Sequence, residues 1–167
     1  MSYRGTFGDF TDELAVYASS SNPPPSPHRG TPMTQQIFVN LPVRDLKRSV
    51  DFFTALGYRF NPQFTDERAT CMIVGDNIFV MLLVKDFFEA YTGRPIADTS
   101  KVTETIISLN APDRAGVDEM VRKAKAAGAS VPKTPTDHGF MYQHGFLDPD
   151  GHMWDYFYMH AMPEQGT

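Results

Sequence analysis

The chain has 167 residues, of which 41% are hydrophobic and 21% charged, and this composition is typical of a globular protein with room for one domain or two small modules. The formal net charge is -5 and no basic run could neutralise phosphates, which argues against general nucleic-acid binding. The single cysteine, Cys71, excludes an intrachain disulfide and a cysteine-rich zinc site. With no apolar run near the roughly 20 residues of a membrane span, we expect a cytoplasmic protein without a membrane partner.

The N-terminal part of the chain has a different composition from the rest. Residues 22–32 contain five prolines, which favours an extended segment that packs poorly. We therefore expect residues 1–32 to be a disordered or loosely docked proline-rich extension. The alternative is an arm that covers a pocket or a partner subunit. Residues 33–162 should form the folded domain, and residues 163–167 a short tail.

The first half of the domain, about residues 36–85, predicts a strand, a helix and three more strands. The first strand covers 37–43, and Asp45 can cap a helix that Gly57 ends. The expected apolar face of that helix consists of Leu46, Val50, Phe53 and Leu56. Short strands are expected at 58–64, 69–75 and 77–84, followed by a connector at 85–101 with about one helical turn.

The second half, about residues 103–160, repeats this order. A strand at 103–111 precedes a helix that starts after Asp113 and stops at Gly128. The expected apolar face of this helix consists of Val117, Met120, Val121 and Ala124. Strand-like segments follow at 130–134, 140–148 and 152–159. The repeated pattern predicts an internal duplication in which two modules share a sheet that neither could bury alone.

Two motifs carry a family resemblance: Val43-x-Asp45-Leu46-x-x-Ser49-x-x-Phe52-Phe53 early in the chain, and Asp148-Pro149-Asp150-Gly151 before the last strand. The stretch from Gln36 to Met159 resembles the vicinal oxygen chelate superfamily, which includes glyoxalase I, extradiol dioxygenases, and fosfomycin- and bleomycin-resistance proteins. The resemblance implies an α+β fold with two paired βαβββ modules that form a cup-shaped mixed sheet, with helices on its outer face. It also implies a homodimer.

Many members of this superfamily hold a divalent metal with His, Glu or Gln side chains on the inner faces of four strands. The resemblance places these ligand positions at Phe38, Val80, Ile106 and Asp155, with Glu104 two residues from Ile106 on the same face. Because Asp155 alone has a ligating side chain, we expect no metal and no other cofactor. The alternative is Fe, Mn, Ni, Co or Zn bound by Asp155 together with Glu104, Gln143 or His144.

Strand alternation gives an independent test of these positions. In the last strand, Asp155 shares a face with Met153 and Phe157, and the opposite face carries Trp154, Tyr156 and Tyr158. In the preceding strand, Gln143 and Gly145 share one face, and Tyr142, His144 and Phe146 the other. Either Gln143 neighbours Asp155 in the cup, or a bulge at Gly139 or Gly145 places His144 there instead. The sequence leaves this register open.

These patterns lead to a functional hypothesis and two alternatives. An apolar cup with one inner carboxylate predicts a protein that binds a small organic molecule, or that transforms it by acid/base chemistry. The expected catalytic residues are Asp155, His144 and Tyr142; the expected ligand-binding residues are Phe38, Asn40, Val80, Glu104, Ile106, Gln143 and Phe157. The alternatives are a metal-dependent lyase, isomerase or dioxygenase, and a protein-interaction module that uses the N-terminal arm.

Overall fold

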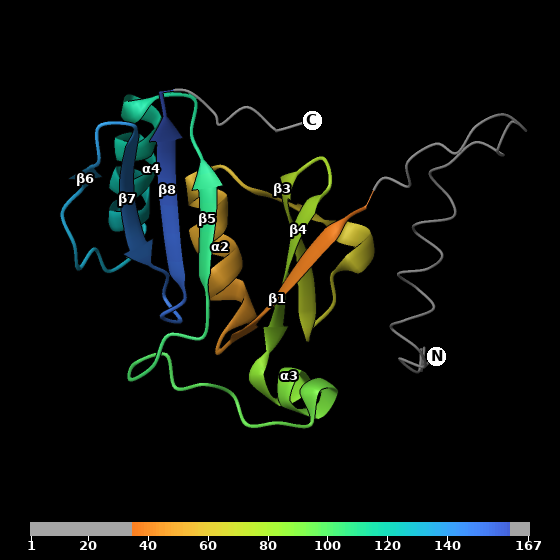
Figure 1. The fold of residues 1–167 in the computed structure, drawn as a ribbon. Coiled ribbons are helices and arrows are strands. Elements are labelled where there is room, and N and C mark those ends of the chain that lie inside the picture. Colours follow the sequence, from red (N-terminus) through yellow and green to blue (C-terminus); the bar gives the residue numbers. More distant parts are fainter. Residues whose placement is uncertain (1–34, 161–167) are drawn as a thin grey trace, which may run out of the picture. The chain divides into compact units, whose positions relative to one another are not determined.

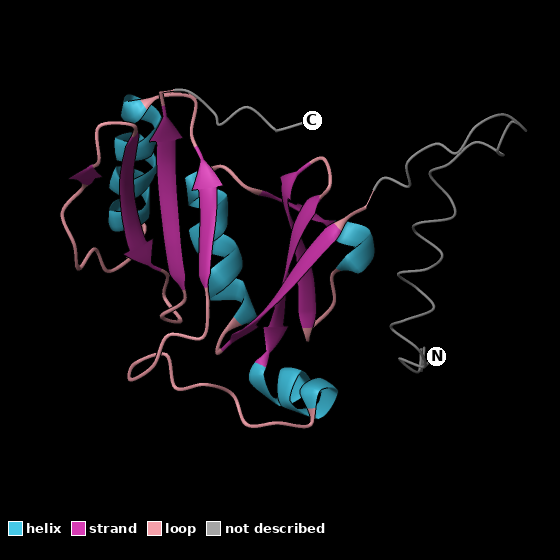
Figure 2. Ribbon diagram, viewed as in Figure 1, coloured by secondary structure: helices cyan, strands magenta, loops and turns pink. Residues whose placement is uncertain are grey.

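A computed structural model describes residues 35–160, and these form two βαβββ modules (Figures 1 and 2). The first module contains β1 (Ile37–Val43), α2 (Leu46–Leu56), β2 (Arg59–Asn61), the 3-10 turn η1 (Pro62–Phe64), β3 (Ala69–Gly75) and β4 (Ile78–Val84). After α3 (Lys85–Thr92), the second contains β5 (Ile106–Asn110), α4 (Arg114–Ala126), β6 (Thr136–Asp137), β7 (Met141–Leu147) and β8 (Met153–Met159). The expected α+β class is confirmed. The extension at 1–32 and the tail at 163–167 lie outside the described residues.

The strands form two separate mixed sheets with the same internal order. The first sheet is β1-β4-β3-β2 and the second is β5-β8-β7-β6. In each sheet the first strand pairs in parallel with the last strand of its module, and the other neighbours are antiparallel. The repeated order supports the expected duplication. Within residues 35–160, no helix has the length and apolar character that crossing a bilayer requires.

Both sheets and both long helices share one hydrophobic core. Phe53 of α2 packs on Trp154 of β8 with ring centroids 5.0 Å apart, and Phe52 packs on Phe146 of β7 at 6.0 Å. In Figure 1, α2 accordingly lies between the strands of the two sheets. Each sheet therefore buries one face against helices, as expected. The face of the second sheet that carries Asp155 lies on the side away from this core.

Local structure agrees with most of the expected element ends. The Asp45 side chain accepts a hydrogen bond from the Arg48 N–H at 3.0 Å, and Asp113 caps α4 through the Gly116 N–H at 2.7 Å. Other expectations were wrong in detail. Ser49 and Phe52, and not Val50, are among the buried residues of α2. The connector forms the two-turn helix α3, and the segment 130–134 is not a strand, because Pro132 cannot donate to a sheet.

The Asp-Pro-Asp-Gly turn joins the two modules. The Asp150 carboxylate is buried and accepts hydrogen bonds from the Arg44 N–H at 2.9 Å and from the Ser49 hydroxyl at 3.1 Å. It also pairs with the guanidinium groups of Arg44 and Arg48. Burial by itself would raise the pKa of Asp150, but these donors from the first module together hold it below its ordinary value. The motif thus links the two modules through hydrogen bonds and ion pairs.

A buried histidine makes a second contact between the modules, next to this turn. Both ring nitrogens of His152 face acceptors: Nε2 lies 2.8 Å from the Pro42 carbonyl oxygen, and Nδ1 lies against a Glu104 carboxylate oxygen. Since a carbonyl can only accept, Nε2 donates to the Pro42 oxygen, and Nδ1 faces the Glu104 carboxylate. This contact ties β1, the connector before β5 and the start of β8 together.

Candidate ligand-binding site

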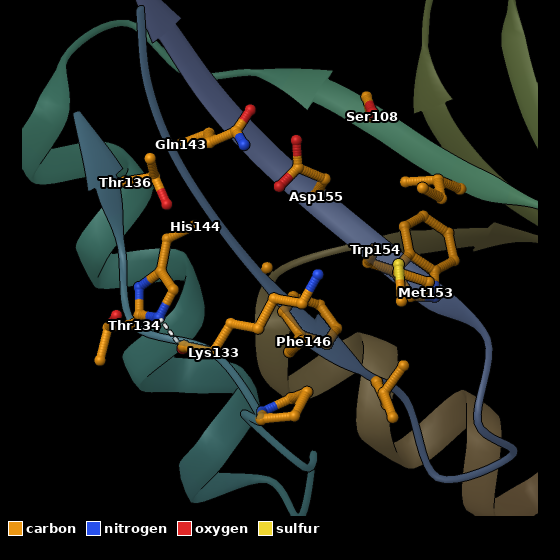
Figure 3. Close-up of a pocket in the computed structure, with 14 residues that line it drawn as sticks. Ser108, Lys133, Thr134, Thr136, Gln143, His144, Phe146, Met153, Trp154 and Asp155 are labelled. Carbon is orange, nitrogen blue, oxygen red and sulfur yellow. Dashed lines mark hydrogen bonds between the residues drawn. The ribbon is translucent and has the colours of Figure 1, made fainter. Parts of the chain in front are cut away.

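The open face of the second sheet contains a pocket of about 290 Å³ (Figure 3). Strands β5, β7 and β8 form its floor, and the loop between α4 and β6 forms one wall. Its lining residues are Ile106, Ser108, Pro132, Lys133, Thr134, Thr136, Gln143, His144, Gly145, Phe146, Leu147, Met153, Trp154 and Asp155. We call it the second-sheet pocket.

The strand register decides which side chains point into this pocket. Strands β7 and β8 pair without a bulge, so that Gly145 lies opposite Asp155 and Gln143 opposite Phe157. On the other side of β8, Ser108 of β5 pairs with Asp155. Gln143 and Asp155 therefore share the open face. His144 is on the helix side, which resolves the register that the sequence left open.

Gly145 shapes the floor of the pocket beneath the Asp155 carboxylate. A Cβ atom at Gly145 would lie 2.6 Å from the Trp154 carbonyl oxygen and 3.3 Å from Asp155 Oδ1. Any larger residue would displace the backbone of β8. A glycine inside a strand often marks such a close approach, and here its missing side chain leaves room beside the carboxylate.

Asp155 is half-buried and has no hydrogen-bonding partner among residues 35–160. Burial raises its pKa above the ordinary value of 3.8, and the nearby charges of His144 and Lys133 oppose that rise. Gln143 likewise makes no side-chain hydrogen bond to another described residue. Figure 3 shows the Gln143 and Asp155 side chains close together on the open face. Neither side chain is engaged by another residue between 35 and 160.

His144 supports the pocket from its edge. Its Nε2 atom lies 3.1 Å from the Lys133 carbonyl oxygen and donates a hydrogen bond to it. Its buried Nδ1 atom has no hydrogen-bond partner in the part of the chain that the structure describes, and Asp118 Oδ1 is 4.0 Å away. His144 therefore holds the wall segment that carries Lys133, and its ring is on the opposite side of β7 from Asp155.

The structure brings together only some of the residues singled out from the sequence. Ile106, Gln143, His144 and Asp155 line the pocket, and Phe157 lies on the same face just beyond the lining. Three others have different contacts. Tyr142 donates a hydrogen bond to Asp118 of α4 at 2.8 Å, Glu104 binds His152, and Phe38 stacks on Phe79 of the first sheet with centroids 4.8 Å apart.

Val80 is not the counterpart of Asp155 in the first module. It is fully buried in the shared core and pairs with Val39. Asn40 and Ser108 occupy equivalent places before the two helix caps, and their strand partners are Met81 and Asp155. The turn before β4 is shorter than the Asp-Pro-Asp-Gly turn. An alignment of the two modules that counts residues from these turns is therefore wrong by one residue, and it selects Val80 in place of Met81. The Asn40 side chain is exposed, on the face of the first sheet opposite the shared core, and Asn40 does not line the second-sheet pocket.

Other pocket residues had no assigned role in the sequence analysis. Among them are Ser108, Lys133, Thr134, Thr136 and Met153. Ser108 and Met153 could have been predicted from the sequence, because strand alternation places both on the face of Asp155. Lys133 could not be found in this way, since its loop reaches the pocket through tertiary contacts with β7.

Within the described part of the chain, the donor groups do not come together in the way that a metal site requires. Among residues 35–160, no group of three His, Cys, Asp or Glu side chains could hold a metal ion. Asp155 is the one carboxylate in the pocket lining, Glu104 is engaged by His152, and the His144 imidazole belongs to the other face of β7. In this chain the pocket offers one carboxylate and one amide, which is a poor set for a divalent transition metal.

Comparisons with known proteins agree with this fold. Residues 35–75 match the family model "Bleomycin resistance protein-like N-terminal". The structure of hypothetical protein SA1046 from S. aureus is 31% identical, covers 75% of this chain and 95% of its own, and superposes with a TM-score of 0.65. A glyoxalase-related enzyme from Fulvimarina pelagi is 16% identical, with 80% and 96% covered and a TM-score of 0.65. No curated protein matches the chain.

A drug-resistance protein has the same architecture. The fosfomycin resistance protein FosX from Mesorhizobium loti is 17% identical, covers 75% of this chain and 92% of its own, and gives a TM-score of 0.56. The chain therefore has the fold of the glyoxalase/bleomycin resistance/dioxygenase, or vicinal oxygen chelate, proteins, and its residues 35–75 match a bleomycin resistance protein-like family model.

Proposed function

We propose that this protein binds a small organic molecule in the second-sheet pocket, without a metal ion, and that Asp155 is the main polar anchor. The observation that carries the proposal is the Asp155 carboxylate itself, which faces the cavity beside Gly145 and has no partner within residues 35–160. A half-buried carboxylate without a hydrogen bond is costly to keep, and a ligand donor would offset that cost.

The composition of the pocket supports binding of a compact molecule. Its volume is near the lower end of the range for small-molecule sites. Ile106, Leu147 and Met153 supply apolar contact, and a few polar groups can fix the orientation of the ligand. The donor set supports metal-independent binding, because no second carboxylate or imidazole among residues 35–160 lies beside Asp155 on the open face.

The proposal includes a homodimer in the cytoplasm. Ile106, at the pocket, is 55% exposed and Phe140, before β7, is 66% exposed, so apolar side chains remain uncovered on the second module. A second copy could cover them. The free thiol of Cys71 suits a reducing compartment. Analytical ultracentrifugation tests the dimer, and a monomer at all concentrations would contradict it.

Proton transfer by Asp155 is a second candidate function. The observation in its favour is that burial raises the pKa of this carboxyl, which brings it closer to the range useful for general acid/base catalysis. His144 and Tyr142 would take no direct part, because their rings are on the helix side of β7. Exchange of carbon-bound hydrogen of a bound compound in D₂O, lost in Asp155→Asn, would support this candidate.

The binding proposal is tested with a library of neutral, cationic and anionic fragments. Compounds that bind the pocket should shift the backbone amide resonances of Ser108, Gly145 and Asp155 in ¹⁵N spectra. Ser108→Phe should abolish these shifts, since the new ring fills the cavity. Asn110→Phe is the matched control, because Asn110 is two residues further along the same face of β5 and does not line the pocket.

The same experiment separates metal-independent from metal-dependent binding. The shifts should persist after treatment with EDTA, and added Mn, Fe, Co, Ni or Zn should not strengthen them. Binding that appears only with one of these metals would overturn the metal-independent form of the proposal. Shifts that are unchanged in Ser108→Phe would show that the ligand site lies elsewhere.

A further inference from the structure

The second-sheet pocket holds two opposite charges that are not paired with each other. Asp155 comes from β8 and Lys133 from the loop after α4, and both line the cavity. Neither side chain forms an ion pair or a hydrogen bond with any residue between 35 and 160. Their proximity is nevertheless sufficient for the Lys133 charge to lower the pKa of Asp155 against the effect of burial. The pocket lining thus contains a carboxylate and an ammonium group from two different elements.

Lys133 is held in place through its backbone. The His144 ring donates to its carbonyl oxygen, and Thr136, three residues later, pairs with Gln143 in the β6–β7 ladder. These two contacts fix the loop at the lysine and three residues after it. Figure 3 shows the Lys133 side chain extending toward the middle of the pocket. Its ammonium is therefore presented to the cavity by a fixed segment of the chain.

Neutral polar groups accompany each charge. Gln143 and Ser108 lie on the same face as Asp155, and Ser108 is its direct strand neighbour. Thr134 and Thr136 lie near Lys133 along the loop. Carboxylate, amide and hydroxyl oxygens suit an ammonium group, and an ammonium with threonine hydroxyls suits a carboxylate. The apolar side chains of Ile106 and Met153 remain for a hydrocarbon body.

We propose that the ligand of this pocket is a small zwitterion with an aliphatic body, of the amino-acid class, whose ammonium binds at Asp155 and whose carboxylate binds at Lys133. This inference rests on the proposed binding function and names its ligand class. The ligand neutralises both unpaired charges at once, whereas a simple amine or a simple acid leaves one of them without a partner. The size of the cavity agrees with a free amino acid and is small for a folded peptide segment.

The test compares L-leucine with its two single-charge analogues. 3-Methylbutylamine lacks the carboxylate, and 4-methylpentanoate lacks the ammonium. Affinities are measured at neutral pH by titration of the Gly145 and Ser108 amide resonances. L-leucine should bind roughly tenfold or more tightly than either analogue, since each analogue lacks one of the two charge-assisted contacts. Equal affinities for the three compounds would overturn the inference.

Two variants assign each charge to its residue. Lys133→Met should remove the advantage of L-leucine over 3-methylbutylamine, and Asp155→Asn should remove its advantage over 4-methylpentanoate. The controls are Lys125→Met on the exposed side of α4 and Asp76→Asn in the turn before β4, which should change nothing. A preference that survives in both pocket variants would contradict the assignment.

The outcome also distinguishes this inference from the proposed function. If other library fragments shift the pocket resonances and L-leucine has no preference, the zwitterion is excluded and the binding function stands. If neither L-leucine nor any fragment shifts them, both proposals fail. Because Lys133→Met leaves the backbone contact of His144 intact, loss of folding is not expected there, and the amide spectrum of the variant checks this directly.

Discussion

Gly145 and Asp155 lie opposite each other in the β7–β8 ladder, and the missing side chain of the glycine leaves open the space beside the carboxylate. Gly145→Ala should therefore destabilise the fold, by about 1–3 kcal/mol, because the new methyl group would press on the Trp154 carbonyl. Urea denaturation measures this change. Gly75→Ala is the control, since a Cβ there meets Ile78 at an ordinary 3.8 Å. Equal stabilities of the two variants would contradict the tight β7–β8 contact.

The second prediction concerns the pH dependence of cation binding at Asp155. Burial raises the pKa of this carboxyl above 3.8, with His144 and Lys133 as the charged groups that oppose the rise. The anionic form exists above the raised value, so binding of 3-methylbutylamine should be lost as the pH falls through it. The midpoint should lie above 3.8 and should disappear in Asp155→Asn. A midpoint unchanged in this variant would assign the titration to another group.

The third prediction concerns the link between the modules at Asp150. Asp150→Asn removes the charge that Arg44, Arg48 and Ser49 share, and we expect a loss of about 2 kcal/mol in the free energy of unfolding. Since the pKa of Asp150 is lowered in the folded state, its contribution is present above the unfolded pKa and is lost as the pH falls through the folded value. Asp51→Asn, in an exposed pair with Lys47, is the control and should have little effect.

The fourth prediction concerns the buried imidazole of His152. His152→Asn can satisfy either Glu104 or the Pro42 carbonyl, but not both, so one buried polar group loses its partner. We expect destabilisation of about 2 kcal/mol. His138→Asn, in an exposed loop, is the comparison and should leave the urea midpoint unchanged. A double-mutant cycle with Glu104→Gln should show coupling; additive effects would mean that the two side chains act independently.

The fifth prediction concerns the reactivity of Cys71. This thiol is fully buried in β3, and burial raises its pKa to about 11. The native protein should therefore fail to react with Ellman's reagent at neutral pH, and one equivalent of thiol should appear after denaturation in guanidinium. Rapid reaction of the native protein would show that β3 opens readily.

Several features follow from the sequence alone because they depend on neighbouring residues. The caps Asp45 and Asp113 and the alternation in β7 and β8 are local patterns, and the structure confirms each of them. The duplicated βαβββ order and the placement of Asp155 opposite the core face of Trp154 follow from the same periodicities. The family motifs agree with this fold.

Other features required contacts between distant parts of the chain. The alignment of the two modules, counted from the turns, was wrong by one residue because the turns differ in length. Val80 lies in the core, and its neighbour Met81 is the counterpart of Asp155. Glu104 is engaged by a histidine 48 residues away, and Lys133 reaches the pocket through His144. Sequence periodicity determines which face of a strand a residue occupies. Only the packing of both sheets on one helical core decided that the Asp155 face of the second sheet stayed open, and only tertiary contacts brought Asp155 and Lys133 to the lining of one pocket.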